Sequence, residues 1–465
     1  MAKIEMKKLK LFVTLALLVT SKASEIFAQN GVPPFLQPIN IYPTPSPTPF
    51  VKKTGSSSPT NPINPIESSA SINIINDVTL NSVIPSYSGI LVETLDGKII
   101  REYNADFTFN PASNAKVATA YAILKTYGPD YRFQTAVYTD GEIDLENARL
   151  EGNLYVSGRD PMFQLQNAVM IADALNKLGV REVNGNLIVT DRFTINQINS
   201  AQKSAKVLLS NLNAARRSTS ATKAWLRYLE ESGLAIQGVY SPSVYLTGDA
   251  YIGVVPEGAK LLFVHESAPL KEIIKAMMCQ SNNFIAERLG NELGGAYVVA
   301  NIVQRSTGVS PQEFYLQTSS GLGINRVTPR AMMKLLRVFR KELDYYGMTF
   351  ADVMPVAGID SGTLQNRFND IYSIGSLVGK TGTLGNTDGG VSSLSGEMQT
   401  KNGGKLLFVI FNQYGNIRRF RNFQDAYIRQ IQNEFGGPVT FAYSSTNLQQ
   451  KLAQSRIIFS STTRN

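Results

Sequence analysis

The sequence predicts an α+β fold in which an antiparallel sheet packs against helices and a second, strand-rich domain is inserted into the chain. Two strand-like runs meet at Asp96-Gly97, a dipeptide that favours a hairpin turn. Residues 378–411 hold further strand-like runs, with an apolar helical stretch at 117–124 before them and a helical pattern at 420–434 after them. Helices that precede and follow an antiparallel sheet are typical of the α+β class.

The first 28 residues carry the features of an export signal. Four lysines between positions 3 and 10 precede an apolar stretch at 11–20, which is too short to span a bilayer. Cleavage fits after Ala23 or after Ala28, and an uncleaved membrane anchor is the alternative interpretation. Residues 29–71 are rich in Pro, Ser, Thr and Asn and predict an extended linker. We therefore expect an exported protein of the periplasm or cell envelope.

The remaining chain is expected to form two domains. One domain is predicted from two segments, 72–138 and 261–443, and the other is inserted between them at 139–260. The inserted stretch has its own turn signals, beginning with Asp140-Gly141, and its own apolar pattern, so it can enclose a separate core. Residues 444–465 are predicted to form a C-terminal tail.

Composition excludes several classes of function. The 45 Lys and Arg residues exceed the 36 Asp and Glu residues, but no dense basic run with interleaved aromatics indicates a nucleic-acid binder. The excess suits anionic polymers or acidic peptides as partners, and a solvated basic surface is the alternative. A single histidine, His265, excludes a zinc site built on several histidines, and a single cysteine, Cys279, excludes an intramolecular disulfide. No metal or other cofactor is predicted.

A candidate nucleophile lies where a loop enters the apolar helix at 117–124. Ser113 and Lys116 are three residues apart, which on a helix brings the hydroxyl and the amine onto one face. Lysine can then serve as the base that histidine supplies in other serine enzymes. The same spacing occurs in polar surroundings at Ser200–Lys203 and Ser220–Lys223, so this pair alone is a weak signal.

Two further motifs follow in the chain. Ser281-x-Asn283 interrupts a long amphipathic helix predicted over 270–293, and Lys380-Thr381-Gly382, followed by Thr383, begins a strand. Their structural context separates them from chance copies of the same patterns, which occur at Ser71–Asn73, Ser445–Asn447 and Lys53–Gly55. The alternative interpretation of Ser281 and Asn283 is a polar turn that breaks the helix, and that of Lys380 is a solvated strand end.

Each residue of the first two motifs has a chemical task in an acyl-transfer reaction. Ser113 would attack a carbonyl and carry the acyl group. Lys116 must be neutral to accept the proton, which requires burial or a neighbouring cation such as Lys380. Ser281 would relay the proton to the leaving amine, and the Asn283 amide would orient Lys116 and the substrate.

The third motif is predicted to bind substrate. Lys380 and the hydroxyls of Thr381 and Thr383 would hold a carboxylate through charge-assisted bonds. Gly382 would let the substrate lie close against the strand. The backbone N–H groups of Ser113 and Thr383 would form an oxyanion hole, in which one donor is typically worth about 3 kcal/mol.

Together the motifs resemble those of the penicillin-binding protein 4-type D-alanyl-D-alanine carboxypeptidases/endopeptidases, the class C low-molecular-mass penicillin-binding proteins. The resemblance spans about Ile90–Gly437. Besides the three motifs it rests on the blocks Tyr131–Phe133, Leu154–Pro161, Val183–Leu187, Gly321-Leu322, Asn325–Pro329 and Pro355–Gly358. It implies a β-lactamase/transpeptidase-like domain with an insertion, metal-independent chemistry, peptidoglycan stem peptides as substrates and β-lactam antibiotics such as penicillin as acylating inhibitors.

Two blocks depart from the family pattern. The usual Asp-Gly-Ser-Gly reads Thr318–Gly321, and the Gly-Asp-Pro block reads Gly158–Pro161. The interval between the first two motifs is short, so the further domain nested in long members is expected to be absent, with the polar stretch 196–222 in its place. The expected activity is a serine-type D-alanyl-D-alanine carboxypeptidase, with DD-endopeptidase activity as an addition. The alternatives are a β-lactamase and a non-catalytic wall-binding or antibiotic-sensing module; the oligomeric state is not predicted.

Overall fold

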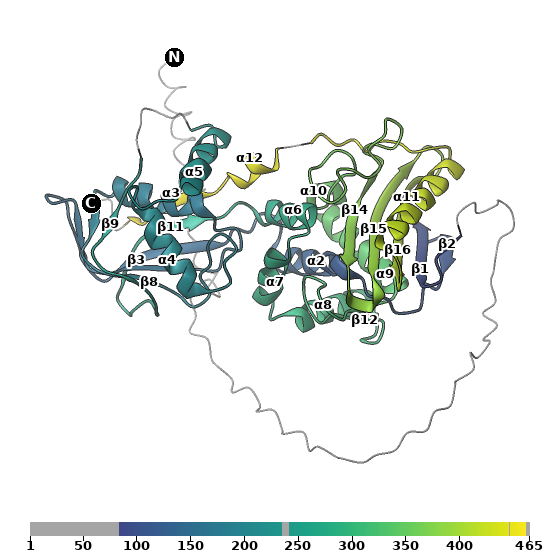
Figure 1. Cartoon of the computed structure of the whole chain (residues 1–465), viewed down its shortest axis with the longest axis horizontal. Coiled ribbons are helices and arrows are strands. Elements are labelled where there is room, and N and C mark those ends of the chain that lie inside the picture. Colours follow the sequence, from purple (N-terminus) through teal and green to yellow (C-terminus); the bar gives the residue numbers. More distant parts are fainter. Residues whose placement is uncertain (1–82, 235–240, 446, 462–465) are drawn as a thin grey trace, which may run out of the picture. The chain divides into compact units, whose positions relative to one another are not determined.

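The structure, a computed structural model, describes residues 83–234, 241–445 and 447–461 (Figure 1). The predicted export signal, the predicted linker and the first residues of the predicted catalytic segment lie outside the described residues. No helix in the described ranges is long and apolar enough to cross a membrane.

The main sheet is antiparallel and has five strands in the order β14-β15-β16-β1-β2. The strands are β14 at Leu377–Leu384, β15 at Val391–Thr400, β16 at Gly404–Gln413, β1 at Ser88–Thr94 and β2 at Ile99–Tyr103. The predicted hairpin is confirmed, because β1 and β2 pair across the turn that contains Gly97, whose φ is +101°. Within this sheet the first strand in the chain, β1, thus lies beside the last one, β16. Strand β14 forms one edge of the sheet.

Helices cover both faces of this sheet (Figure 1). They are α2 at Ala115–Tyr127, α6 at Leu270–Gln280, α7 at Asn283–Glu292, α8 at Ala296–Thr307, α9 at Pro329–Tyr345, α10 at Phe350–Val353 and α11 at Ile417–Glu434. Alternate side chains of β16 serve the two faces: Leu407 and Val409 pack with the α2 and α9 side, whereas Phe408 and Ile410 pack with α11. Burial on both faces explains why β16 reads as a continuous apolar run.

The helix that follows the candidate nucleophile is buried on all sides. Every residue of α2 from Ala115 to Leu124 is buried, which explains its lack of a polar face. The helix begins just after the 3₁₀ turn η1 at Ala112–Asn114 and ends at Tyr127, with Gly128 as its C-cap. Its enclosure places Lys116 in the interior of the protein.

A second region has its own sheets and its own core. Six strands run in the order β10-β8-β6-β3-β11-β17, at Ala250–Ile252, Leu187–Val189, Leu154–Gly158, Gln134–Thr139, Lys260–Glu266 and Arg456–Phe459. A four-stranded sheet runs β4-β5-β7-β9, at Glu142–Asp144, Arg149–Glu151, Glu182–Val183 and Tyr245–Leu246. Three helices pack there, α3 at Leu165–Lys177, α4 at Ala201–Leu212 and α5 at Thr219–Glu231. The predicted strand-rich insertion is therefore present.

The polar stretch 196–222 contributes to this second region. It contains α4, whose apolar residues Ala205, Leu208 and Leu212 are buried in the core of the region. Within the described residues this stretch forms no further domain of its own.

The strand pairing changes the predicted domain boundaries. Strands β3 and β11, which the sequence assigned mainly to the catalytic segments, pair with each other in the six-stranded sheet. The predicted C-terminal tail is wrong, because α12 at Leu448–Leu452 is followed by β17, which pairs with β11. A four-residue strand has little sequence signal, and pairing covers an otherwise open sheet edge. We propose boundaries near residues 133 and 267, with β17 assigned to the inserted domain.

Candidate active site

The candidate nucleophile lies in η1, directly before α2. The backbone of Ala112 has a φ of +46°, a left-handed conformation that turns the chain into the helix. Ser113 is partly exposed, whereas Ala112 and Asn114 on either side are buried. As predicted from the spacing, Ser113 Oγ lies 3.0 Å from Lys116 Nζ.

Polar side chains fasten this turn to strand β15. Asn114 Nδ2 donates to Ser393 Oγ at 2.7 Å, and Ser393 Oγ donates to the carbonyl of Pro111 at 2.6 Å. Ser395 Oγ also donates to the Asn114 side chain. Because all of these groups are buried, the bonds hold the nucleophile at a defined place beside the sheet.

Lys116 is completely buried, and its amine has three oxygen neighbours. Nζ lies 2.7 Å from Asn283 Oδ1, 2.6 Å from the carbonyl of Ser320 and 3.0 Å from Ser113 Oγ. Burial lowers the pKa of Lys116 to about 7, against a smaller rise caused by the Glu287 carboxylate. Of the two expected causes, burial is the one that keeps this amine partly neutral near pH 7.

The neighbours also determine which way the proton can move. An amide oxygen and a backbone carbonyl only accept hydrogen bonds, so the two N–H groups of a neutral Lys116 point to Asn283 and Ser320. The lone pair then faces Ser113, the one neighbour with a proton to donate. This arrangement is the one that a lysine base requires.

The carbonyl of Ser320 belongs to a block in which the side chains depart from the family pattern. Glu287 holds this turn by accepting from the backbone N–H of Ser320 at 2.9 Å, and Thr119 donates to the carbonyl of Ser319 at 2.7 Å. A Cβ on Gly321 would lie 1.9 Å from the carbonyl oxygen of Ala112, so only glycine fits. Backbone atoms thus supply the contact with Lys116, which explains why different side chains can occupy the block.

Ser281 of the second motif contacts Lys380 of the third motif. Ser281 ends α6 with a φ of +52°, and Lys380 Nζ donates to its Oγ at 2.8 Å. Asn282 caps α7 by accepting from Ile285 N, which turns Asn283 toward Lys116. The predicted helix break thus presents Ser281 to one lysine and Asn283 to the other.

Lys380 lies in the interior of the protein. It is fully buried, and its amine donates to Ser281 and to the carbonyl of Thr381 at 2.7 Å. Burial first, and the charge of Lys116 second, hold the pKa of Lys380 well below its usual range. Since its amine donates to Ser281 Oγ, Lys380 is placed to act on that hydroxyl.

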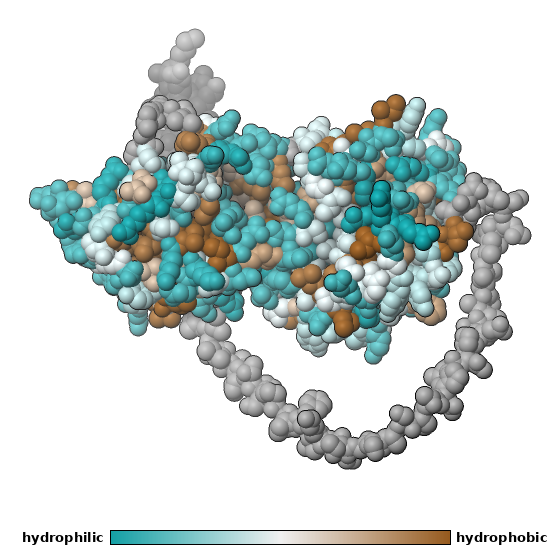
Figure 2. All heavy atoms as spheres, viewed as in Figure 1, coloured by the Kyte–Doolittle hydropathy of each residue, from teal (hydrophilic) through white to brown (hydrophobic). Residues whose placement is uncertain are grey.

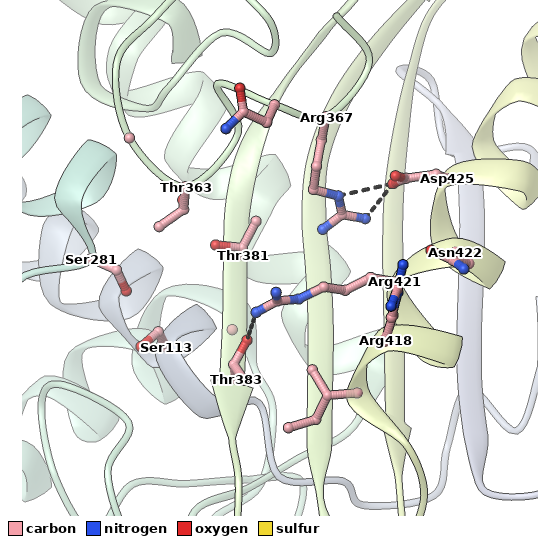
Figure 3. A pocket seen from close by; sticks show the side chains of 14 residues that line it. Ser113, Ser281, Thr363, Arg367, Thr381, Thr383, Arg418, Arg421, Asn422 and Asp425 are labelled. Carbon is pink, nitrogen blue, oxygen red and sulfur yellow. Dashed lines mark hydrogen bonds and ion pairs between the residues drawn. The ribbon is translucent and has the colours of Figure 1, made fainter.

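A pocket of about 940 Å³ opens in front of these residues (Figure 3). Of the predicted residues, Ser113, Ser281, Thr381, Gly382 and Thr383 line it. Lys116 and Lys380 are buried behind this lining, and Asn283 is exposed outside it. The other lining residues are Gly362, Thr363, Asn366, Arg367, Ile417, Arg418, Arg421, Asn422 and Asp425. The reactive hydroxyls are therefore accessible, and both amines are screened.

Comparison with known proteins identifies the family. The model of the D-Ala-D-Ala carboxypeptidase 3 (S13) family matches residues 73–204 and 212–431. The chain belongs to this family. The S13 peptidase is 24% identical to D-alanyl-D-alanine carboxypeptidase DacB of Haemophilus influenzae, over 74% of this chain and 88% of that protein. It is 25% identical to a D-alanyl-D-alanine carboxypeptidase of Actinomadura sp., over 73% and 79%.

Solved structures show the same fold. A predatory endopeptidase of Bdellovibrio bacteriovorus acylated by penicillin G matches with a TM-score of 0.67 at 22% identity, over 78% of this chain and 96% of that one. Penicillin-binding protein 4 of Haemophilus influenzae in complex with a β-lactam matches with a TM-score of 0.56 at 23% identity, over 74% and 96%.

The single histidine of this S13 peptidase lies away from the pocket. His265, on β11, is buried beside Asn167 and the ring of Phe163, and burial lowers its pKa to about 3. It therefore cannot serve as the base for Ser113. Cys279 is buried as predicted, which raises the pKa of its thiol to about 11. No group of three or more His, Cys, Asp or Glu side chains in the described residues could hold a metal ion.

The second divergent block also lies outside the pocket lining. Asp160 is buried, accepts from Met162 N at 2.8 Å and has its pKa raised by burial to about 7. Arg159 pairs with Glu292 of α7 at 3.3 Å. In this structure Asp160 stabilises a turn, and Arg159 forms an ion pair with α7.

Sequence reasoning missed the basic side chains of the pocket. Arg421 Nη2 donates to Thr383 Oγ1 at 2.8 Å, and Arg367 pairs with Asp425 (Figure 3). The only available signal was the helical pattern over 420–434, because an arginine on an exposed helix face is ordinarily solvated.

The packing around Gly382 also requires a glycine. A Cβ there would lie 2.1 Å from Ser393 Oγ and 2.8 Å from the carbonyl oxygen of Pro111. These atoms belong to the contact between η1 and the sheet. Gly382 thus allows the nucleophile turn to pack against β14.

We expect Gly382→Ala to destabilise the protein by about 1–3 kcal/mol, because the added methyl overpacks a buried contact. The free energy of unfolding and the rate of penicillin acylation measure the effect, and both should fall. Gly385→Ala is the matched control, since a Cβ there meets nothing within 4 Å. Equal stability of the two variants would contradict the assigned contact.

Proposed function

We propose that this S13 peptidase is an exported serine-type D-alanyl-D-alanine carboxypeptidase that acts on peptidoglycan stem peptides in the periplasm or cell envelope. Ser113 carries the acyl group, and DD-endopeptidase activity on cross-links is an addition. The supporting observation is the buried Lys116 amine, whose two acceptors leave its lone pair facing Ser113.

In the proposed acylation, Ser113 Oγ attacks the carbonyl carbon of the penultimate D-alanine and its proton moves to Lys116. The C–N bond breaks as Ser281 gives a proton to the leaving nitrogen and regains one from the lysine pair. Water then attacks the ester carbonyl carbon and gives a proton to Lys116. The ester bond to Ser113 Oγ breaks as Lys116 passes that proton to Oγ, which releases the acid and restores both groups. Lys380, 2.8 Å from Ser281 Oγ, orients this relay.

Strand geometry supports the proposed oxyanion hole. The N–H of Gly379 points to the open edge of β14, where it donates to the carbonyl of Pro355. Backbone groups alternate sides along a strand, so the N–H groups of Thr381 and Thr383 face the same edge. Ser113 lies in the turn packed against this strand, so its N–H and that of Thr383 are candidates for the two donors.

The proposed carboxylate site consists of Thr381 and Thr383, whose side chains line the pocket. Arg421 donates to Thr383 Oγ1, so the hydroxyl proton of Thr383 is left to donate to a substrate carboxylate. This arrangement suits a free C-terminal carboxylate next to the scissile amide.

The pocket lining weighs against a β-lactamase. Its one acidic residue, Asp425, is already paired with Arg367. The described lining thus contains no free carboxylate to activate water against a penicilloyl ester. A non-catalytic wall-binding or antibiotic-sensing module would have no use for two amines buried behind the nucleophile.

Labelling with a fluorescent penicillin tests the proposal. We expect Ser113→Ala to lose both covalent labelling and the release of D-alanine from a D-Ala-D-Ala peptide. Ser220→Ala is the matched control, because Ser220 has the same spacing to a lysine but is exposed on α5. Labelling of Ser113→Ala at the parental rate would refute the assignment of the nucleophile.

A further inference from the structure

The pocket carries more positive charge than its acidic residues neutralise. Of its charged lining residues, Arg367 and Asp425 form a pair, with Nε 2.9 Å from Oδ1. Arg418 and Arg421 form no ion pair with any carboxylate in the described ranges. Two cations are therefore available at one wall of the pocket.

Both arginines come from the start of α11. Residues 418 and 421 are three positions apart, so they share one face of the helix, and both line the pocket. Arg421 reaches from α11 to Thr383 on β14 (Figure 3). Strongly hydrophilic residues gather over α11 (Figure 2), yet Arg419, exposed in the same turn, does not line the pocket.

A leaving group with a single carboxylate would not contact the two guanidinium groups of Arg418 and Arg421. Under the proposed function, Thr381 and Thr383 take the carboxylate adjacent to the scissile amide. Arg421 donates to the Thr383 hydroxyl, and Arg418 adds a second guanidinium on the same helix face. Planar guanidinium groups bind carboxylates through paired hydrogen bonds, and bringing two of them together is favourable when an anion lies between them.

We propose that Arg418 and Arg421 form a second anion subsite, beyond Thr383, which binds a further carboxylate of the leaving group. The preferred substrate is then a peptide whose leaving half is itself acidic, as in a cross-link between two stem peptides. This inference rests on the proposed function of Ser113, and it assigns the leaving-group specificity to α11. The chemistry is unchanged: the amide C–N bond breaks, and the leaving amine departs with the relayed proton.

The test uses N-acylated D-alanyl dipeptides that differ in the leaving residue. This residue is D-glutamate, D-2-aminoadipate or D-2-aminopimelate, each compared with its side-chain amide, so that charge changes while length and shape are kept. We expect the parent to cleave the acid at least about tenfold faster than the amide, in kcat/KM, for at least one length. Arg418→Ala and Arg421→Ala should reduce this ratio to less than about threefold.

Arg419→Ala is the control, since it removes the same charge from the same helix turn outside the pocket lining. It should keep the parental ratio. An acid-to-amide ratio near one in the parent at all three lengths would overturn the subsite, as would an equal loss in the Arg419 variant. If the parent is not acylated by penicillin and releases no D-alanine, the proposed function itself fails, which is a separate result.

Discussion

Replacing Lys116 with arginine is expected to reduce the acylation of Ser113 by about 10²- to 10⁴-fold, the usual contribution of a positioned general base. Arginine stays protonated at every working pH, so it has no lone pair to accept the Ser113 proton. The measurement is the second-order rate constant for labelling by a fluorescent penicillin.

Because Lys116 is fully buried, a guanidinium there could also unfold the protein. Lys116→Met separates the two effects, since it is neutral, of similar length and equally unable to accept a proton. A folded Lys116→Met protein, judged by its thermal transition, should show the same loss of labelling. Lys223→Arg, in the exposed copy of the motif, is the control and should label like the parent. Parental labelling by a folded Lys116→Met protein would exclude Lys116 as the base.

The rate of acylation should also depend steeply on pH. Burial lowers the pKa of Lys116 to about 7, and only the neutral amine accepts the proton. The amine is half neutral at its pKa and about 1% neutral two pH units lower, so the rate should drop by about fiftyfold between pH 7 and pH 5. Above pH 8 the rate should level off, since the amine is then largely neutral.

Two charged side chains, Glu287 and Lys380, affect the midpoint of this pH profile. Glu287 raises the pKa of Lys116, so Glu287→Gln should move the midpoint to lower pH. Lys380 is buried nearby and has its own pKa lowered, so the measured midpoint belongs to the lysine pair. Circular dichroism across the range checks that the fold persists. A rate that is flat, or that falls as pH rises through 7, would contradict a lysine base.

Local spacing made much of the fold and part of the site predictable. The hairpin at Asp96-Gly97 and the apolar run of β16 follow from turn chemistry and residue pattern. The proximity of Ser113 and Lys116 follows from helical spacing, and the helix break at 281–283 follows from consecutive polar residues. All of these depend on neighbours in the chain.

Other features had no local signal. The wrong prediction of a tail at 444–465 arose because β17 is short, and its partner β11 lies almost 200 positions earlier in the chain. The bond between Lys380 and Ser281 is another such feature, because it depends on where α6 ends relative to β14. Such contacts join residues whose distance in the sequence carries no information about their distance in space.

The sequence by itself determined the chemical groups of this S13 peptidase: a hydroxyl and an amine one helical turn apart, a polar break in a helix, and a strand with hydroxyls on it. Only the tertiary structure decided how those groups work. It buried Lys116, which lowers its pKa, and it brought the carbonyl of Ser320 to that amine, a backbone atom present in every residue type. It also placed Arg421 against Thr383, a contact that requires α11 to pack on β15, the strand next to β14. Burial and backbone contacts arise from packing between distant segments, so residue identity alone could not specify them.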